Sequence, residues 1–234
     1  MQTEKQLSIK GLYLPAIALC SFLFSGNAAH AALVTFSFTG GASTISGALL
    51  STPLGPSPLS LGLPVTGSFQ FDTMTGGVGG NYPGAVKAMT LTIGSYTSAF
   101  ALGANAVTIL QNTNLGGGLV GDRWKLVTAA DGPPVKGYTP FSFDLQLDRE
   151  GGGLFPNTDL QNPPSLSSSS SPLTATRWRL MFQNDDGNVV TARGTFQSLT
   201  AVPLPSSAIL FGVGLIALVG LGAGGLRNLR GPQA

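Results

Sequence analysis

The sequence predicts an all-β fold for the long central part of the chain, an antiparallel β-sandwich of jelly-roll type. Apolar and polar residues alternate there with a period of two, as they do in strands that bury one face. Clusters of Gly, Pro and Asn separate the alternating segments and indicate turns. No segment between residues 33 and 200 carries the apolar stripe and the caps of a helix. An up-and-down barrel is the alternative arrangement of the same strands.

Nine segments are expected to form strands, each bounded by turn residues. In chain order they are residues 33–38, 65–72, 86–93, 95–102, 107–111, 123–128, 141–148, 177–182 and 189–199. The interruptions are rich in Gly, Pro and Ser, and the longest is Asn157–Pro172. Such segments bury too little apolar surface to offset the entropy of ordering, so we expect them to be surface loops.

Three of the segments show the alternation most clearly, and each gives one apolar and one polar face. The expected buried residues are Val65, Phe69 and Phe71 in the first, Phe141, Phe143, Leu145 and Leu147 in the second, and Trp178, Leu180 and Phe182 in the third. Antiparallel sheets with one solvated face have this pattern. By the same alternation Trp124 and Trp178 are predicted to lie in the core. Tyr82 and Tyr138 stand in expected loops and are the aromatic residues predicted to be exposed.

The last two segments are predicted to form a hairpin around the loop Asn184–Asn188. If the numbers of paired residues sum to 372, Phe182 faces Val190 and Leu180 faces Ala192. Apolar residues then meet apolar residues along one face of the hairpin. This agreement between pattern and turn favours the register.

The same register gathers three arginines on the polar face of the hairpin. It places Arg179 opposite Arg193, with Arg177 two residues along the strand. Like charges directly opposite each other destabilise a sheet, so we expect an acidic group nearby. The Asp144 and Asp148 face of a neighbouring strand is the favoured source. In the alternative interpretation the three arginines contact a polyanionic glycan.

Asp144, Asp148 and Glu150 are candidate carboxylates for glycoside hydrolysis, which needs two acids roughly 5–10 Å apart. Residues i and i+4 on one strand are about 13 Å apart, so Asp144 and Asp148 do not form such a pair by themselves. A partner would have to come from another strand. The favoured interpretation is that these residues keep one face of the sheet hydrated.

Asp185, Asp186 and Asn188 offer oxygen ligands for Ca²⁺. The segment lacks the ligand spacing and the distal Glu of an EF-hand loop. Asn, Asp and Gly also favour tight turns through their own backbone preferences, and a plain turn is the favoured interpretation.

The first 31 residues have the three parts of a secretory signal peptide. Lys5 and Lys10 precede a short apolar stretch, residues 11–24, and Ala29 and Ala31 form an A-x-A site. Cleavage is therefore expected between Ala31 and Ala32.

Removal of residues 1–31 takes away Cys20 and His30, the only Cys and the only His. The mature chain then has no thiol and no imidazole, which excludes Ser-His-Asp and Cys-His catalysis and a His-bearing metal site. Residues 32–202 hold eight Lys or Arg and nine Asp or Glu, so the exported part is near neutral. No nucleic-acid partner and no cofactor are expected.

The C-terminal segment has the parts of a membrane-sorting signal. It begins with Val202, Pro203, Leu204 and Pro205. An uncharged stretch follows, residues 208–226, which as a helix spans roughly 28 Å and is long enough to cross a bilayer core. Arg227 and Arg230 come directly afterwards and are expected to stay in the cytoplasm as the stop signal.

This layout of proline motif, Gly/Leu/Ala-rich helix and basic end resembles the PEP-CTERM sorting signal of Gram-negative bacteria. Leu204 stands where the name-giving motif has Glu, and the two arginines are separated. The resemblance implies recognition by an exosortase, a membrane-embedded enzyme that is thought to cut near the motif. An ordinary C-terminal anchor that is never cut is the alternative.

The expected organisation is therefore a signal peptide (1–31), a β-sandwich ectodomain (32–201) and a sorting signal (202–234). We expect a protein exported across the cytoplasmic membrane, first anchored there and then at the cell surface or outside it. The predicted role is non-catalytic association with exopolysaccharide or biofilm matrix. The alternatives are a secreted carbohydrate-active hydrolase that uses carboxylates and a membrane-tethered subunit of a surface complex.

Overall fold

A computed structural model of the chain describes residues 33–50, 56–164, 166 and 173–202. The expected signal peptide with Ala29, Ala31 and Ala32, the motif residues Pro203, Leu204 and Pro205, the expected helix 208–226, and Arg227 and Arg230 all lie outside the described residues. Val202 is the last described residue and ends a strand. No helix within the described ranges is long and apolar enough to span a membrane.

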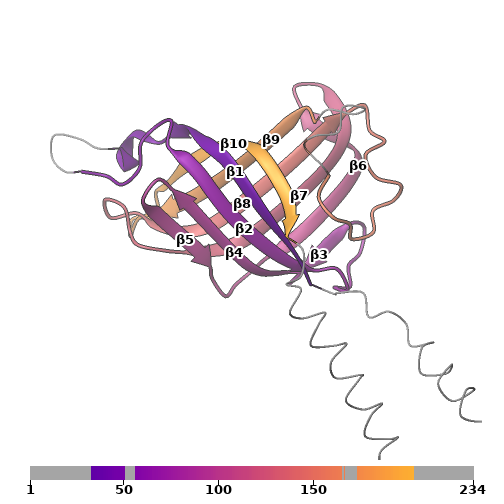
Figure 1. Ribbon diagram of the computed structural model, residues 1–234, viewed down its shortest axis with the longest axis horizontal. Coiled ribbons are helices and arrows are strands. Elements are labelled where there is room, and N and C mark those ends of the chain that lie inside the picture. The colour runs from indigo at the N-terminus through magenta and orange to yellow at the C-terminus, as the bar shows by residue number, and fades with distance from the viewer. Residues whose placement is uncertain (1–32, 51–55, 165, 167–172, 203–234) are drawn as a thin grey trace, which may run out of the picture. The chain divides into compact units, whose positions relative to one another are not determined.

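The described residues form ten strands and one short 3-10 helix (Figure 1). In chain order these are β1 (Leu33–Ile45), η2 (Gly47–Leu49), β2 (Pro64–Asp72), β3 (Asn81–Pro83), β4 (Val86–Ile93), β5 (Tyr96–Phe100), β6 (Ala106–Gly116), β7 (Leu119–Asp131), β8 (Thr139–Glu150), β9 (Ala175–Gln183) and β10 (Val189–Val202). All nine predicted strands are present, and only β3 was not predicted.

β3 and β4 lie end to end and form one line of the sheet, and β5 and β6 lie end to end and form the next line. Tyr82 of β3 faces Val107 of β6, and Leu91 of β4 faces Ser98 of β5, so paired residue numbers sum to 189 in both ladders. β5 and β6 also share one edge of β7. The ten strands therefore form eight lines. Each line is hydrogen-bonded to the lines that come before and after it in the chain.

The sheet closes into an eight-stranded antiparallel barrel, which replaces the predicted two-sheet sandwich. Closure comes from the first and last strands: β1 and β10 pair from Thr35 opposite Val202 to Ile45 opposite Ala192. This is the up-and-down alternative that the sequence left open. Period-2 alternation is the same in a sandwich and a barrel, because both bury one face of each strand.

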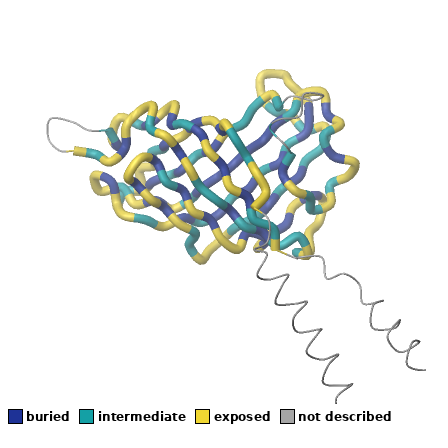
Figure 2. The backbone as a smooth tube through the Cα atoms, in the orientation of Figure 1, coloured by how far each residue is buried: buried dark blue, intermediate teal, exposed yellow. Residues whose placement is uncertain are grey.

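Aromatic side chains fill the interior of the barrel. Phe38 of β1 stacks on Phe143 of β8 at 6.3 Å between ring centroids, and Phe69 of β2 lies 5.9 Å from Trp124 of β7. These contacts cross from one wall to another, as expected for a small barrel whose interior holds side chains. Figure 2 shows the resulting alternation of buried and exposed positions along the strands.

The predicted buried faces are confirmed with one exception. The residues that the structure buries as predicted are Val65, Phe69, Phe71, Phe143, Leu145, Leu147, Trp178, Leu180 and Phe182, together with Trp124. Phe141 is 39% exposed, so its predicted burial was wrong. A β-bulge between Pro140 and Ser142 adds Phe141 as an extra residue to β8 and turns it off the apolar face.

The predicted exposure of Tyr82 was also wrong. Tyr82 lies in β3 and is buried, and its hydroxyl donates a hydrogen bond of 2.7 Å to the backbone oxygen of Thr158. Tyr138 is half-buried and packs against the core. The segment after β8 covers Tyr82, a contact between residues 76 positions apart that local patterns do not carry.

A buried carboxylate holds the beginning of that segment. Asp122 of β7 points to the same side of its strand as Trp124 and is buried. Its oxygens accept hydrogen bonds from the backbone N–H groups of Asn112 at 3.0 Å, Leu154 at 2.7 Å and Phe155 at 3.4 Å. Farther along, the indole of Trp124 donates to the backbone oxygen of Gln161 at 3.0 Å. The polar side chain thus replaces backbone partners that the loop cannot supply itself.

Candidate functional site

The β9–β10 hairpin has the predicted register. Phe182 faces Val190, and Arg179 faces Arg193, with paired numbers summing to 372 throughout. The loop Asn184–Asn188 is closed by its own backbone, since the N–H of Asn184 donates to the backbone oxygen of Asn188 at 3.2 Å. Three arginines therefore lie on the outer face of the barrel, opposite to the side of the strands that packs the core.

Asp144 supplies the acidic group expected beside the arginines. It lies directly opposite Arg179 across the β8–β9 ladder, and the two form an ion pair. Arg179 Nε donates to Asp144 Oδ2 at 2.9 Å, and Nη2 donates to the same oxygen. The sequence-based expectation of a carboxylate from the neighbouring strand is confirmed.

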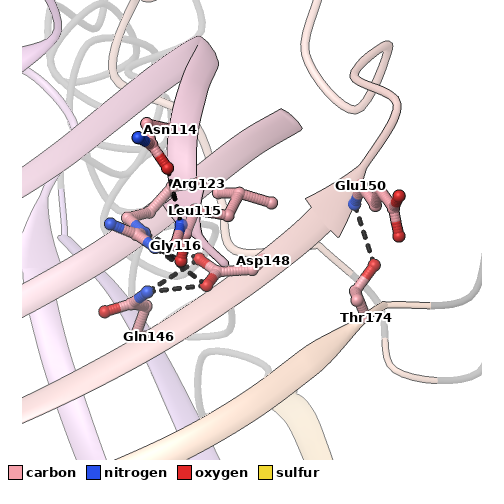
Figure 3. Close-up of polar contacts among 8 residues, drawn as sticks. All are labelled: Asn114, Leu115, Gly116, Arg123, Gln146, Asp148, Glu150 and Thr174. Carbon is pink, nitrogen blue, oxygen red and sulfur yellow. Dashed lines mark hydrogen bonds and ion pairs between the residues drawn. The ribbon is translucent and has the colours of Figure 1, made fainter. Parts of the chain in front are cut away.

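A second ion pair lies farther along β8 on the same outer face (Figure 3). Arg123 of β7 binds Asp148 through two bonds, Nε to Oδ1 at 2.8 Å and Nη2 to Oδ2 at 3.0 Å. Gln146 Nε2 also donates to both Asp148 oxygens, at 2.8 and 2.7 Å. Because its amide nitrogen faces Asp148, the amide oxygen of Gln146 points away from it, as Figure 3 shows.

Arg177 and Arg193 differ from the two paired arginines. Both are exposed, and neither forms an ion pair within the part of the chain that the structure describes. They border a cleft of about 360 Å³ that opens on the outer face over β8, β9, β10 and the adjoining edge of β1. Its lining residues are Ser43, Asp144, Gln146, Arg177, Trp178, Arg179, Arg193, Gly194 and Thr195.

Gly194, which lines the cleft, faces the barrel interior, like its strand neighbours Ala192 and Phe196 and its cross-strand partner Trp178. Gly194 has no side chain, and a Cβ there would lie 1.8 Å from the Gly41 carbonyl oxygen and 2.9 Å from Trp178 Nε1. The indole N–H of Trp178 is buried, and within the described residues it is the buried side-chain polar atom that has no hydrogen-bond partner. Close backbone approach at Gly194 thus excludes any larger residue from this position.

The candidate catalytic carboxylates do not form a free pair. Asp144 and Asp148 are both buried and each is bound by an arginine. Four residues of strand separate them by about 13 Å, too far for a glycosidase pair. Glu150 is exposed at the end of β8, where its backbone N–H donates to Thr174 Oγ1 at 2.8 Å (Figure 3).

The candidate Ca²⁺ ligands lie in the tight turn between β9 and β10. Asn184 Oδ1 accepts the N–H of Asn188 at 2.8 Å, and Asn184 Nδ2 donates to Asp186 Oδ2 at 3.2 Å. Asp185 is exposed. Three or more His, Cys, Asp or Glu side chains do not gather around a common point anywhere in the described ranges.

Two buried tyrosines have shifted ionisation. Burial, with the nearby Asp131 carboxylate, raises the pKa of Tyr96 to about 12. Burial and the Asp159 carboxylate also raise the pKa of Tyr82. Both phenols donate to backbone oxygens, Tyr96 to that of Pro133 at 3.0 Å. Their hydroxyls hold loops on the barrel and are separate from the cleft.

Sequence reasoning named the arginines and Asp144 but missed the other half of the cleft. Ser43 and Thr195 come from strands that meet only when β1 and β10 close the barrel, so no local pattern joins them. Gln146 alternates with the apolar residues of the expected strand 141–148, but nothing in the local sequence assigns it a role. Comparison of the chain with protein-family models, with curated proteins and with solved structures finds no match in any of the three.

Proposed function

We propose that this is an exported, exosortase-sorted surface or matrix protein that acts by binding rather than by catalysis. The N-terminal signal takes the chain across the cytoplasmic membrane of a Gram-negative cell. The C-terminal segment anchors the precursor and is then processed by an exosortase. The barrel is displayed at the cell surface or released, where it associates with extracellular polysaccharide.

The arrangement of the barrel's charges is the observation that carries the binding role. The buried carboxylates of β8 are each committed to an arginine, Asp144 to Arg179 and Asp148 to Arg123. A carboxylate whose oxygen is already bound by a guanidinium is not free to act as a nucleophile. The core is filled by aromatic rings, so recognition falls to the outer face, where a cationic cleft lies.

Mass spectrometry of the extracellular protein tests the sorting part of the proposal. We expect an N-terminus at Ala32 and a C-terminus between Pro203 and Ser207. Deletion of the exosortase should leave the precursor in the membrane fraction with its C-terminus intact. Mature surface protein that still contains Arg230 would reduce the tail to a plain anchor.

Fractionation and turnover assays test the rest of the proposal. The processed protein should sediment with extracellular polysaccharide and should be released when that polysaccharide is digested. Incubation with the same polysaccharide should leave its chain length unchanged. Shortening of the polysaccharide that Asp144→Asn or Glu150→Gln abolishes would establish the hydrolase alternative instead.

A further inference from the structure

We propose that the cleft over β8, β9 and β10 is a binding subsite for one acidic unit of a polysaccharide, with Arg177 and Arg193 as the residues that contact the anion. The acidic character of the ligand follows from the cleft itself. Its origin in a polysaccharide rests on the proposed function.

The charge of the cleft is positive and is not balanced within it. Three arginines and one carboxylate line it, a formal charge of +2 at neutral pH. Asp144 neutralises Arg179, so the excess belongs to Arg177 and Arg193. Arg193 lies directly opposite Arg179, and Asp144 pairs with Arg179 alone. An anion in the cleft would neutralise the charges of Arg177 and Arg193 that no described carboxylate pairs with, which is the reason to expect one there.

The shape of the cleft suits a small polar group. The small side chains of Ser43 and Thr195 line the cleft beside the arginines, and the volume of about 360 Å³ is at the lower end of small-molecule sites. A guanidinium matches the oxygens of a carboxylate, sulfate or phosphate through paired N–H donors. The hydroxyl of Ser43 and the amide oxygen of Gln146 add groups that can bind sugar hydroxyls.

The same features argue against a nucleic acid or a membrane surface. Nucleic-acid binding uses an extended basic stripe that neutralises many phosphates, often with exposed aromatic rings. Here two arginines that form no ion pair within the described residues lie together, on a domain with eight basic and nine acidic residues in 32–202. Among the described residues that line the cleft, Trp178 is the one with a ring, and it is buried. A single acidic sugar unit matches two neighbouring arginines better than the many phosphates of a nucleic acid do.

Calorimetric titration of the purified full chain tests the subsite. The probes are a short oligogalacturonate, a neutral glucose oligomer of the same length, inorganic sulfate, and duplex DNA. We expect binding of the oligogalacturonate at low ionic strength, weakening as salt rises, with sulfate competing and the neutral oligomer silent. Arg177→Gln and Arg193→Gln should each weaken binding at least about tenfold, the lower range for a charge-assisted hydrogen bond.

Two further variants and one stability measurement separate a shaped site from general electrostatics. Lys87→Gln removes an exposed positive charge on β4, outside the cleft, and should leave affinity within about twofold. Thr195→Phe fills the cleft at constant charge and should weaken binding as much as loss of an arginine. Thermal unfolding should show Arg193→Gln to be as stable as the parent or more so, because the Arg179–Arg193 repulsion is gone.

Any of three results would overturn the subsite. Lys87→Gln could weaken binding as much as Arg177→Gln does, Thr195→Phe could leave binding unchanged, or DNA could bind as tightly as the oligogalacturonate. Failure of the subsite can be told apart from failure of the proposed function. A doubly substituted Arg177→Gln, Arg193→Gln protein that is still processed and still sediments with matrix leaves the function standing and removes the subsite. A protein that is never exported removes the function whatever the cleft binds.

Discussion

The carboxylate of Asp144 and the guanidinium of Arg179 form an ion pair across the β8–β9 ladder, on the outside of the barrel. The acid is almost fully buried, whereas the arginine side chain is 44% exposed. Arg179 also lies opposite Arg193 on its other side. Asp144 therefore makes it possible for two arginines to face each other in neighbouring strands.

Asp144→Asn should destabilise the protein by about 1–2 kcal/mol, measured by urea unfolding. The amide keeps the shape but leaves Arg179 facing Arg193 without a counter-charge. Removal of one partner from a fully buried pair costs more, but the exposure of Arg179 lets water solvate its charge. Added salt should recover part of the loss.

A double-mutant cycle checks the cause of that loss. Arg193→Gln in the Asp144→Asn background should restore part of the stability, because it removes the repulsion that Asp144 offsets. Asp185→Asn, on the exposed turn, is the matched control and should change stability by less than about 0.5 kcal/mol. Strictly additive effects of the first two substitutions would show that the three residues do not act together.

Asp122→Ala should destabilise the barrel by about 3 kcal/mol or more. Three backbone N–H groups, on Asn112, Leu154 and Phe155, would lose their acceptor in a buried place. A buried donor left without a partner costs about 1–3 kcal/mol. Asp122→Asn keeps one acceptor oxygen and should cost less than the alanine variant.

Hydrogen exchange locates the effect of these two variants. The amides of Leu154 and Phe155 should exchange much faster in Asp122→Ala. The amides of β9 and β10 should exchange faster only as far as the loss of global stability requires. Asp159→Ala, an exposed acid in the same covering segment, provides the comparison. Unchanged exchange at Leu154 would mean that Asp122 does not hold the segment in place.

Local patterns carried most of the information about faces and hairpins. The alternation of Trp178, Leu180 and Phe182 gave the β9–β10 register, and with it the Arg179–Arg193 pair and its need for an acid. Burial of Asp122 does have a local signal in the sequence. Asp122 stands two residues before Trp124 and so lies on the same face of the strand as this core residue. Its carboxylate is therefore expected to be buried and to need hydrogen-bond donors.

Features that depend on distant parts of the chain were out of reach. Whether the strands form a sandwich or a barrel is decided by β1 meeting β10, and no short-range pattern encodes that pairing. Burial of Tyr82 depends on the segment around Thr158, which lies 76 residues farther along the chain. The bulge at Phe141 shifts one residue out of phase without any Gly to mark it.

Gly194→Ala should destabilise the protein by at least about 2 kcal/mol. The new Cβ would lie 1.8 Å from the carbonyl oxygen of Gly41, so the backbones of β1 and β10 would have to separate. Gly47→Ala is the control, since a Cβ there meets nothing within 4 Å, and it should be close to neutral. Wild-type stability in Gly194→Ala, measured by thermal unfolding, would contradict the close approach of the two strands.

Tyr96 should make the stability of the protein fall as the pH rises above 10. Burial and the Asp131 carboxylate disfavour the phenolate and raise the pKa of Tyr96 to about 12, above its ordinary value of 10.0. Between these two pH values the folded state keeps the proton and the unfolded state releases it. The unfolded state then binds fewer protons, so the free energy of unfolding decreases with pH across this window and is unaffected by Tyr96 below it.

The variant Tyr96→Phe isolates this contribution from other groups that titrate at high pH. Urea unfolding at neutral pH should show a loss of about 1 kcal/mol, because the hydroxyl no longer donates to Pro133. Toward pH 12 the gap between variant and parent should narrow, since only the parent loses stability through Tyr96. The difference in phenolate absorbance between the two folded proteins should titrate near pH 12. A difference that titrates near pH 10, with a constant stability gap, would show that Tyr96 is reached by solvent.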